Sequence, residues 1–385
     1  MALQAICIYR PCWVDASGQR VLGHDEDETT AAIVALRGLP ATPRRVVFVS
    51  QAPEFIEGDT AVVAAAGIDD TTVAVERRLG GPDAVLDAII SAHAGTAVVA
   101  VHADAPAAAA AALIGDAGAA LIDAGAVARS LPLRMRAIGD AEASVYDDPR
   151  LMRERGWRPA TEALGGDMPT VIVGVPKNYA RSVRAQGEDV QGPAAAIIGL
   201  ASVIESRASG RLIAVNGASA RAVDMTDVTG CTVIEIARDP VPIGKTTVDH
   251  SVEIPISLAA YERAFDAKLS LAASVCRCGA VEFPPRPWCS ECGQPSGDAR
   301  RALPRQGAIY SAVTVRIAVP GMRSPYSIAI VDLDGVDLRV MAPITDVPAG
   351  SAAIGDRGSL VLRRMALRRG VPDYGYAFQP EGPAP

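Results

Sequence analysis

The pattern of apolar residues divides the chain into two parts with different periodicities. Over the first 240 residues, short runs of Val, Ile and Ala alternate with segments whose apolar residues recur at helical spacing. Continuous apolar strands separated by helices are typical of a sheet covered on both faces. After Gly307 the apolar runs are short and are punctuated by turns such as Asp334–Gly335, which predicts strands without helices.

The expected elements of the first part fall into two similar sets. The first set has strands at residues 4–9, 45–50, 71–75, 96–101 and 119–123, and helices at 25–37, 59–66 and 82–93. The second set has strands at 170–175, 211–215 and 232–237, and helices at 177–186 and 193–206. The two sets predict an imperfect duplication of an α/β layer. Residues 131–166, rich in charge, Pro and Gly, are expected to form an excursion or loop between the halves.

The rest of the chain predicts a linker, a cysteine-rich ribbon and a small barrel. We expect an α/β domain over 1–240, a Pro- and Gly-rich linker over 241–256, a helix and ribbon over 257–300, and a barrel over 301–385. The helix is expected at 257–272. The later runs AIYSAVTVRIAV, PYSIAIVDLDG, VDLRVMAPI and RGSLVLRRMA are short strands that suit a small all-β barrel such as an OB-fold.

Composition narrows the class of protein. The 385 residues are 49% hydrophobic and 21% charged, which is ordinary for a globular protein with a buried core. The net charge of −7 argues against nucleic acid as the principal partner. The Ala-rich run at 105–112 is too short for a membrane span, and the N-terminus lacks the pattern of a signal peptide. We therefore expect a cytoplasmic protein without a membrane partner.

Four of the seven cysteines lie in the run CRCGAVEFPPRPWCSECG, which pairs Cys276 with Cys278 and Cys289 with Cys292. Two cysteine pairs separated by a short hairpin are typical of a tetrahedral thiolate site for Zn²⁺. Because four thiolates leave no open position for a substrate, a structural role is expected. A redox role for the sulfurs is the alternative.

The chain from about residue 257 to 380 resembles a known family. The cysteine run and the segments GAIYSAVTV, PGMRSPYSIAIVDLDG, IGDRGSLVL and GVPDYGYAFQP are similar to the "domain of unknown function thirty-five" family. The resemblance implies a rubredoxin-like zinc ribbon, an OB-fold and an association with acyl-CoA. One departure is Val275, which stands where the first family cysteine is expected. The basic residues Arg363, Arg364 and Arg368 could meet CoA phosphates or form a solvated rim.

The N-terminal region resembles a second family. The segments YRP at 9–11, GHDEDETTAAIVALR and VVFVSQAPEF are similar to hydroxymethylglutaryl-CoA synthase-like members of the thiolase superfamily. Such enzymes need a nucleophilic Cys at a helix N-terminus, a His, and a second His or an Asn. The turn ERRLGGPD has no Cys, the His position aligns near Val173–Gly174, and the Asn loop aligns with GEDVQG. The catalytic set is therefore expected to be lost.

Other residues are candidates to replace the missing catalytic set. Tyr179 and Asn178 follow Pro176 near the expected active-site face and are candidates for substrate contact, and His24 is a candidate base. Gly80–Gly81 could let the backbone approach a ligand, but a plain helix-entry turn is the expected role. Packing or surface roles are expected for Cys7, Cys12, Cys231, His93, His102 and His250.

These observations predict an accessory subunit. The chain is expected to scaffold, and to supply acyl-CoA to, a separate thiolase-superfamily chain with an intact Cys and His, as a homo- or hetero-oligomer. An alternative is a Cys-independent retro-aldolase or condensing enzyme, in which Tyr179, His24 or Asp25 would serve. A third hypothesis is an acyl-CoA-binding or assembly module without a part in the chemistry.

Overall fold

The computed structural model describes residues 2–51, 59–69, 72–128, 134–135, 144–145, 148–166, 170–248, 257, 259, 262, 264–317, 323–368 and 370–381. The chain forms two compact units. The first comprises Met1–Pro11, Val34–Thr60 and Ile68–Ala237, and the second comprises Cys12–Ile33, Ala61–Gly67 and Arg238–Pro385. The division after residue 237 lies near the expected boundary at 240, but two early segments belong to the second unit.

The first 115 residues build a five-stranded sheet with helices between its strands. The elements in chain order are β1 (Ala2–Arg10), α1 (Glu28–Arg37), β3 (Arg45–Ser50), α3 (Asp59–Ala66), β4 (Ala74–Leu79), α4 (Pro82–Ile90), β5 (Thr96–His102) and β6 (Ala108–Gly115). The strands lie in the order β4-β3-β5-β6-β1. Strand β6 is antiparallel to both of its neighbours, whereas β4, β3 and β5 are parallel.

Residues 119–226 repeat this arrangement. The elements are β7 (Ala119–Ala128), α5 (Pro149–Leu151), a π-helix (Met152–Trp157), α6 (Arg158–Leu164), β10 (Thr170–Val173), α7 (Lys177–Ser182), β11 (Gln186–Gly187), α8 (Ala194–Glu205), β12 (Gly210–Asn216) and β13 (Ser219–Thr226). The strand order is β11-β10-β12-β13-β7, and β13 is antiparallel to both neighbours. When the strands of each half are numbered in chain order, both halves have the spatial order 3-2-4-5-1. The topology thus confirms the expected duplication.

The two sheets meet at their first strands. Leu3 pairs with Ala119 and Ala2 with Ala120, so β1 and β7 share only a short ladder. Strand β14 (Thr232–Ala237) then pairs in parallel with β1. A short hairpin of β8 (Arg134–Met135) and β9 (Ser144–Val145) lies outside the sheet.

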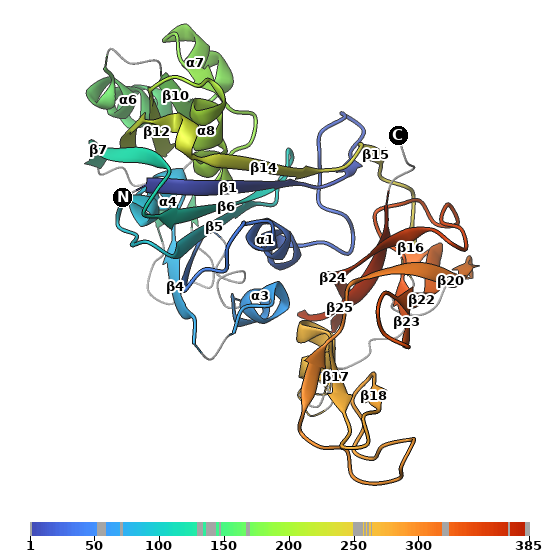
Figure 1. The fold of residues 1–385 in the computed structure, drawn as a ribbon. Helices are drawn as coiled ribbons and strands as arrows, with labels where there is room; N and C mark the ends of the chain where they lie inside the picture. Colours follow the sequence, from blue (N-terminus) through green and yellow to red (C-terminus); the bar gives the residue numbers. More distant parts are fainter. Residues whose placement is uncertain are drawn as a thin grey trace. The chain divides into compact units, whose positions relative to one another are not determined.

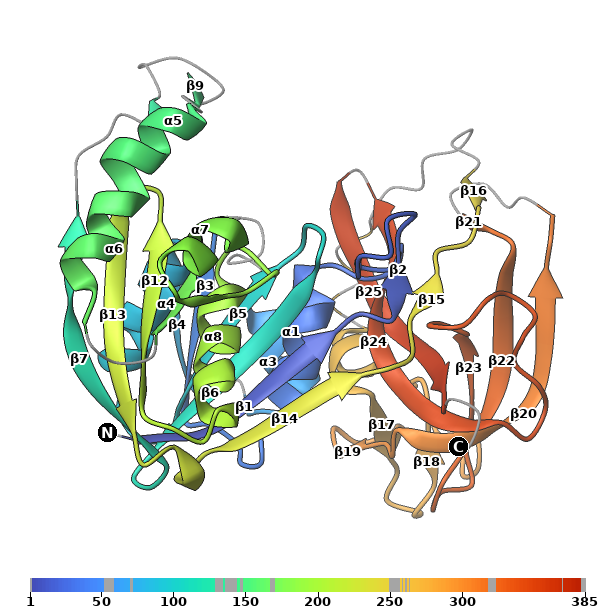
Figure 2. The same cartoon turned by 90° about the horizontal axis from the view of Figure 1, so that it is seen from above.

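Helices α4 and α8 pack on each other and contact strands of both halves (Figures 1 and 2). Ten of the twelve residues of α8 are buried, which explains why its sequence is apolar all round. Small residues bring the layers close: a Cβ at Gly199 would lie 2.7 Å from the Leu212 side chain. Alternate alanines of β6 (Ala108, Ala110 and Ala112) and the buried face of α4 belong to the same core.

Several elements differ from the sequence expectations. The alanine run of β6 is a fully buried strand, and β13 was not foreseen. Within residues 131–166, the described segment 149–164 is helical, so the expectation of a loop is wrong there. Asp148 caps that helix by accepting from the backbone amides of Arg150 and Leu151, and Trp157 and Ala160 are buried. Strand β4 begins at Ala74 instead of 71, and residue 71 lies outside the described residues.

The second unit contains a ribbon and a five-stranded barrel. The ribbon strands are β17 (Ala272–Val275), β18 (Val281–Glu282) and β19 (Arg300–Ala302), in the order β18-β17-β19. The barrel strands are β20 (Gln306–Val315), β22 (Tyr326–Leu333), β23 (Arg339–Pro343), β24 (Arg357–Arg368) and β25 (Val371–Pro380), in the order β23-β22-β20-β24-β25. The expected small barrel is therefore confirmed. A bridge between Ile344 and Phe378 links the two ends of this order.

Smaller elements complete the second unit. They are β2 (Trp13–Val14), β15 (Val241–Pro242), β16 (Thr247–Val248), β21 (Arg323–Ser324) and a π-helix (Asp266–Ser270). Strand β15 pairs with β2, so part of the expected linker is ordered against an N-terminal segment. Within the helix expected at 257–272, residues 266–270 form the π-helix, and Ala272 already belongs to β17. Among the described helices, none has the length and apolarity needed to cross a membrane.

Candidate functional site

The four clustered cysteines converge on one point at the ribbon. Their Sγ atoms all lie within 4.8 Å of one another. The Sγ–Sγ distance is 3.6 Å between Cys276 and Cys292 and 3.7 Å between Cys278 and Cys289. Four thiolates bound at about 2.3 Å around a tetrahedral ion lie about 3.8 Å apart. The cluster therefore has the geometry to hold a metal ion.

Backbone hydrogen bonds form the two cysteine turns. The amide of Gly279 donates to the Cys276 carbonyl at 2.9 Å, and the amide of Gly293 donates to the Cys289 carbonyl at 3.0 Å. Both glycines adopt the left-handed region, with φ of +93° and +67°. A hydrogen bond from the backbone amide of Cys278 lowers the pKa of the Cys276 thiol to about 7. The short Cys-x-Cys spacing thus still brings all four sulfurs together.

The N-terminus of α4 is where the resemblance places the nucleophile. Gly81 precedes the helix, and a Cβ there would lie 2.6 Å from Cγ of Asn216. Gln51 donates from Nε2 to Oδ1 of Asn216 at 3.4 Å. Gly174, near the expected His position, lies beside Pro82, since its Cβ would be 3.4 Å from the Pro82 ring. The segments in which the resemblance places the nucleophile and the His therefore lie side by side, and Asn216 fills the space beside Gly81.

The second half repeats this contact. Gly192 precedes α8 as Gly81 precedes α4, and both glycines are followed by proline. A Cβ at Gly192 would lie 2.6 Å from Nδ1 of His102. His102 ends β5 and Asn216 ends β12, each the fourth strand of its half. Burial lowers the pKa of His102, which favours the neutral imidazole.

Tyr179 and Asn178 lie on α7, and Tyr179 is engaged in packing. The Tyr179 hydroxyl lies 2.7 Å from Oγ1 of Thr161. Its ring meets the Trp157 ring edge-on, with 4.3 Å between centroids. Asn178 is exposed. These contacts fix α7 against the helix that contains Trp157 and Thr161, which is a structural role for Tyr179.

The three cysteines outside the cluster have environments that disfavour a thiolate. Burial raises the pKa of Cys7 and of Cys231 to about 12. Burial also raises the pKa of Cys12, whose Sγ lies 3.9 Å from the Asp346 carbonyl oxygen. A nucleophilic cysteine needs the opposite shift. The expected packing role for these thiols agrees with this geometry.

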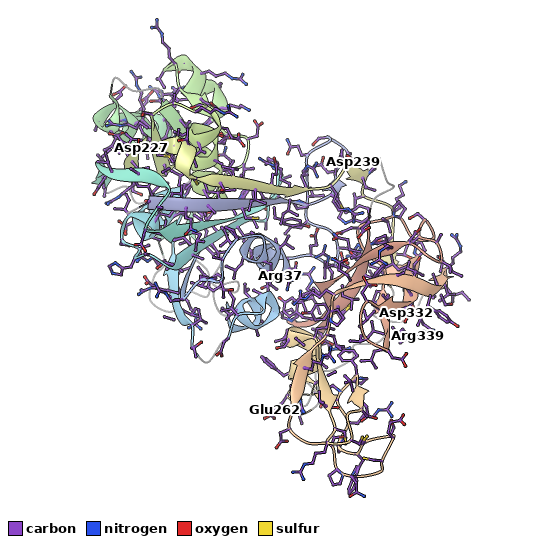
Figure 3. The ribbon with its side chains drawn as sticks, viewed as in Figure 1. Arg37, Asp227, Asp239, Glu262, Asp332 and Arg339 are labelled. Atoms are coloured by element: carbon purple, nitrogen blue, oxygen red, sulfur yellow. The ribbon has the colours of Figure 1, made fainter. Side chains whose placement is uncertain are left out.

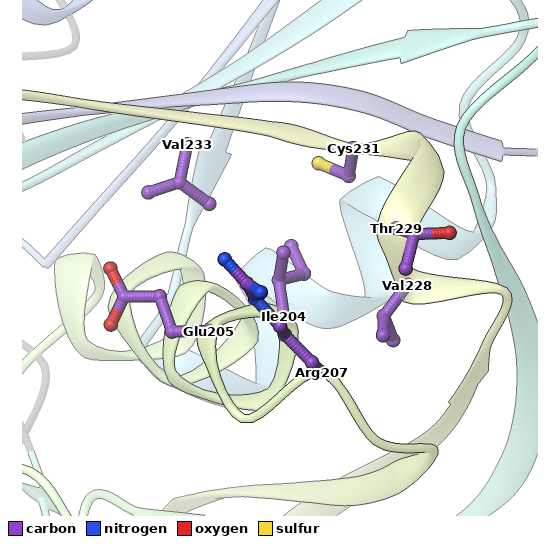
Figure 4. Close-up of a pocket in the computed structure, with 7 residues that line it drawn as sticks. All are labelled: Ile204, Glu205, Arg207, Val228, Thr229, Cys231 and Val233. Atoms are coloured by element: carbon purple, nitrogen blue, oxygen red, sulfur yellow. The ribbon is translucent and has the colours of Figure 1, made fainter.

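Cys231 lines a pocket of about 360 Å³ in the first unit (Figure 4). The other lining residues come from the end of α8, the turn at 228–230 and the start of β14: Ile204, Glu205, Arg207, Val228, Thr229 and Val233. None of the residues proposed from the sequence as catalytic or CoA-binding lines this pocket.

The arginines expected to meet CoA are held in ion pairs within the second unit. Arg363 is fully buried, and its Nη2 lies 2.7 Å from Oδ2 of Asp346 and 3.5 Å from Oε1 of Glu26. A buried guanidinium presents no surface to a CoA phosphate, so the expectation for Arg363 is corrected. Burial opposes ionisation of Asp346, but Arg363, Gln379 and Arg238 together outweigh it and lower the pKa of that carboxyl.

Arg364, Arg368 and His24 are partly accessible. Arg364 lies 3.7 Å from Oδ2 of Asp27 and donates to the His24 carbonyl at 3.2 Å. Arg368 pairs with Asp373 at 2.7 Å. The His24 side chain is exposed. Each arginine thus has a protein partner, and a contact with CoA at Arg364 or Arg368 stays a prediction.

Sequence reasoning missed the contacts of the acidic segment and of Asn216. Asp25 was a candidate only for catalysis, and nothing local indicates that the partners of Asp25, Glu26 and Asp27 lie more than 300 residues later. The Gly-Pro pair before both α4 and α8 is a local signal for a helix start, but it does not indicate the contacts at Gly81 and Gly192.

Sequence comparison finds relatives of the C-terminal region. A family profile described as "ChsH2, C-terminal OB-fold domain" matches residues 300–363. A "DUF35 domain-containing scaffold protein" of Methanocaldococcus jannaschii is 32% identical over 107 residues, which are 27% of this chain and 75% of that protein. The "benzoylsuccinyl-CoA thiolase subunit BbsA" of Thauera aromatica is 32% identical over 106 residues, which are 27% of this chain and 70% of that protein.

Structure comparison finds weaker likenesses. An "Ltp2-ChsH2(DUF35) aldolase" chain has a TM-score of 0.27 at 21% identity, covering 33% of this chain and 96% of that chain. An HMG-CoA synthase complexed with CoA has a TM-score of 0.44 at 10% identity, covering 66% of this chain and 94% of that chain. The layered architecture rests on the strand orders of the two halves.

Proposed function

Because the chain belongs to the DUF35 family through its C-terminal region, we propose that it is an accessory, scaffolding subunit of a thiolase-superfamily acyltransferase complex. In this proposal a separate chain supplies the nucleophilic Cys and the His. The names of two relatives support it, since one is a scaffold protein and the other a thiolase subunit. The relatives match less than a third of this chain, so the role of the first unit is inferred separately.

The observation that carries the proposal is the N-terminus of α4. Acyl transfer to a cysteine uses a thiol at a helix N-terminus, where the dipole and neighbouring groups lower its pKa. Here Gly81 occupies that position, and Asn216 lies so close that a Cβ would stand 2.6 Å from its Cγ. The first unit keeps the duplicated layers, but a cysteine at this position would require the Asn216 side chain to shift. Such a unit is suited to pairing with a catalytic chain of the same architecture.

We propose that Cys276, Cys278, Cys289 and Cys292 hold a structural Zn²⁺. The four sulfurs match the ligand count and the spacing of a closed thiolate site. A zinc ion there would stabilise the ribbon, whose three strands are only two to four residues long. The measurement is metal content by mass spectrometry on the purified chain. One zinc per chain is expected, and a metal-free, fully folded chain would contradict the site.

We propose acyl-CoA as the small-molecule ligand of the complex. Arg364 and Arg368 are the candidate phosphate contacts, because both keep part of their side chains exposed. Calorimetric titration of the full chain with acetyl-CoA tests this point. Saturable binding that weakens in an Arg364→Gln, Arg368→Gln variant is expected. Equal binding by that variant would remove these two residues from the site.

The complex itself is tested by affinity purification of the full chain from its native cells, with mass spectrometry of whatever co-purifies. A stoichiometric thiolase-superfamily chain that carries an intact Cys and His is expected. Recovery of a lone homo-oligomer would contradict the proposal and favour the alternative, a Cys-independent retro-aldolase or condensing enzyme. Turnover by the isolated chain that is lost in Tyr179→Phe would also favour that alternative.

A further inference from the structure

An acidic turn from the N-terminal part of the chain lies on the barrel within the second unit. The acidic turn is defined as residues 23–27. In it Gly23 donates its amide to Glu26 Oε2 at 2.8 Å, and Glu26 donates its amide to the Gly23 carbonyl at 3.0 Å. Asp27 then opens α1: its Oδ1 accepts from the Thr30 amide at 3.0 Å, and its own amide donates to Thr30 Oγ1 at 2.8 Å. This reciprocal cap gives the turn a fixed shape.

The barrel offers this turn hydrogen-bond donors. Thr345 donates its hydroxyl to Asp25 Oδ2 at 2.7 Å, and Tyr374 donates to Asp27 Oδ2 at 3.0 Å. The backbone amide of Arg364 donates to the Asp25 carbonyl at 2.8 Å. Each of these contacts runs from a barrel donor to an acceptor of the acidic turn.

The barrel also places arginines beside the carboxylates of the acidic turn. Arg363 faces Glu26 at 3.5 Å and Asp25 at 4.0 Å, and Arg364 faces Asp27 at 3.7 Å. Asp346, which belongs to the barrel, holds the Arg363 guanidinium at 2.7 Å and also accepts from Gln379. Arg363 is therefore oriented by the barrel itself, independently of the turn. A group oriented before binding loses little entropy when its partner arrives.

We propose that the donor face formed by Thr345, Arg363, Arg364 and Tyr374 is a recognition site for an acidic, helix-opening turn. In this chain the site is filled in cis by the acidic turn, residues 23–27. The inference does not rest on the proposed complex, because it concerns how the barrel unit recognises the chain's own N-terminal segment. It also means that the same face is closed to any other acidic segment while the cis turn is bound.

The test uses the full chain and a fluorescein-labelled peptide of residues 20–37. In the variant Asp25→Asn, Glu26→Gln, Asp27→Asn the cis turn loses its charges and the face becomes available. We expect this variant to bind the peptide at least about tenfold more tightly than the wild-type chain, measured by fluorescence anisotropy. A peptide with the same three amide replacements should bind neither chain. Equal binding of the two peptides, or equal binding by the two chains, would overturn the proposal.

A second measurement applies if the triple variant fails to fold, as judged by circular dichroism. Asp27→Asn alone keeps a helix-capping side chain but removes the charge that faces Arg364 and Tyr374. Hydrogen exchange of residues 24–33 should then accelerate at least about tenfold. The control is Asp123→Asn, which breaks an exposed pair with Arg221 in the first unit. Unchanged exchange in the Asp27→Asn chain would overturn the proposal.

Discussion

The hydroxyl of Tyr374 donates to Oδ2 of Asp27 at 3.0 Å, across 347 residues of sequence. The other carboxylate oxygen of Asp27 accepts the Thr30 amide and so caps α1. One side chain therefore fixes the start of a helix and attaches it to β25 of the barrel. Burial raises the pKa of Tyr374, so its hydroxyl stays protonated and available as a donor at neutral pH.

Tyr374→Phe tests this contact. The change removes one hydrogen bond to a carboxylate and leaves the ring in place, which we expect to cost about 1.5–3 kcal/mol of unfolding free energy. Chemical denaturation followed by tryptophan fluorescence measures the loss. Tyr310→Phe is the matched control, because Tyr310 is half exposed and such substitutions usually stay within about 0.5 kcal/mol. Equal effects of the two changes would deny Tyr374 its anchoring role.

Asp346→Asn tests the buried ion pair. Arg363 would keep its charge without its nearest carboxylate, and breaking a buried pair from one side costs roughly 3–5 kcal/mol. Asp334→Asn is the control, since the pair between Asp334 and Arg357 is about half exposed and worth at most about 1 kcal/mol. Thermal unfolding of both variants gives the comparison. A Tm for Asp346→Asn as high as that of the control would show that the pair contributes little.

Low pH should weaken the ion pair between Asp346 and Arg363 by protonating the carboxylate. The pKa of Asp346 in the folded chain lies below the ordinary value of 3.8, so its stabilisation is present above that value and is lost as pH falls below it. We expect the unfolding free energy to drop in this range more steeply for the wild-type chain than for Asp346→Asn. Denaturation curves between pH 5 and about pH 2.5 measure the difference. Parallel pH profiles would contradict the assignment.

Removal of one thiolate should release the metal. Cys289→Ser leaves three sulfurs, and we expect bound zinc to fall from one per chain to nearly none, with loss of protection in the ribbon. Cys231→Ser is the control because Cys231 lies outside the cluster. Metal analysis and hydrogen exchange provide the readouts. Zinc that survives in Cys289→Ser at full occupancy would mean that the four sulfurs do not act as one site.

Gly81→Cys tests why the nucleophile position is empty. The new Cβ would lie 2.6 Å from Asn216 Cγ, and overpacking of this kind costs about 1–3 kcal/mol. Asn216→Ala should relieve that cost. We therefore expect Gly81→Cys to destabilise the Asn216→Ala chain less than it destabilises the wild-type chain. Thermal unfolding of the four chains gives the cycle. Additive effects would show that the two residues do not compete for space.

The sequence by itself determined the elements whose patterns are local. Strand β3, helix α3 and strand β14 lie at the expected bounds, because continuous apolar runs and helical periodicity depend only on neighbouring residues. The four clustered cysteines were also identifiable, since ligand spacing within 17 residues is a local property. Alanine-rich β6 was missed because alanine favours helices and only the surrounding layers make it a strand.

Tertiary structure alone decided which distant residues meet. Arg363 reads as a surface cation in a basic run, yet it is buried because Asp346 and Glu26 surround it. Gly81 reads as a flexible turn, yet Asn216 from the other half limits the space beside it. Both outcomes depend on contacts between segments separated by up to several hundred residues. Local composition carries no information about such pairs, because chain topology sets them when the sheets and the barrel close.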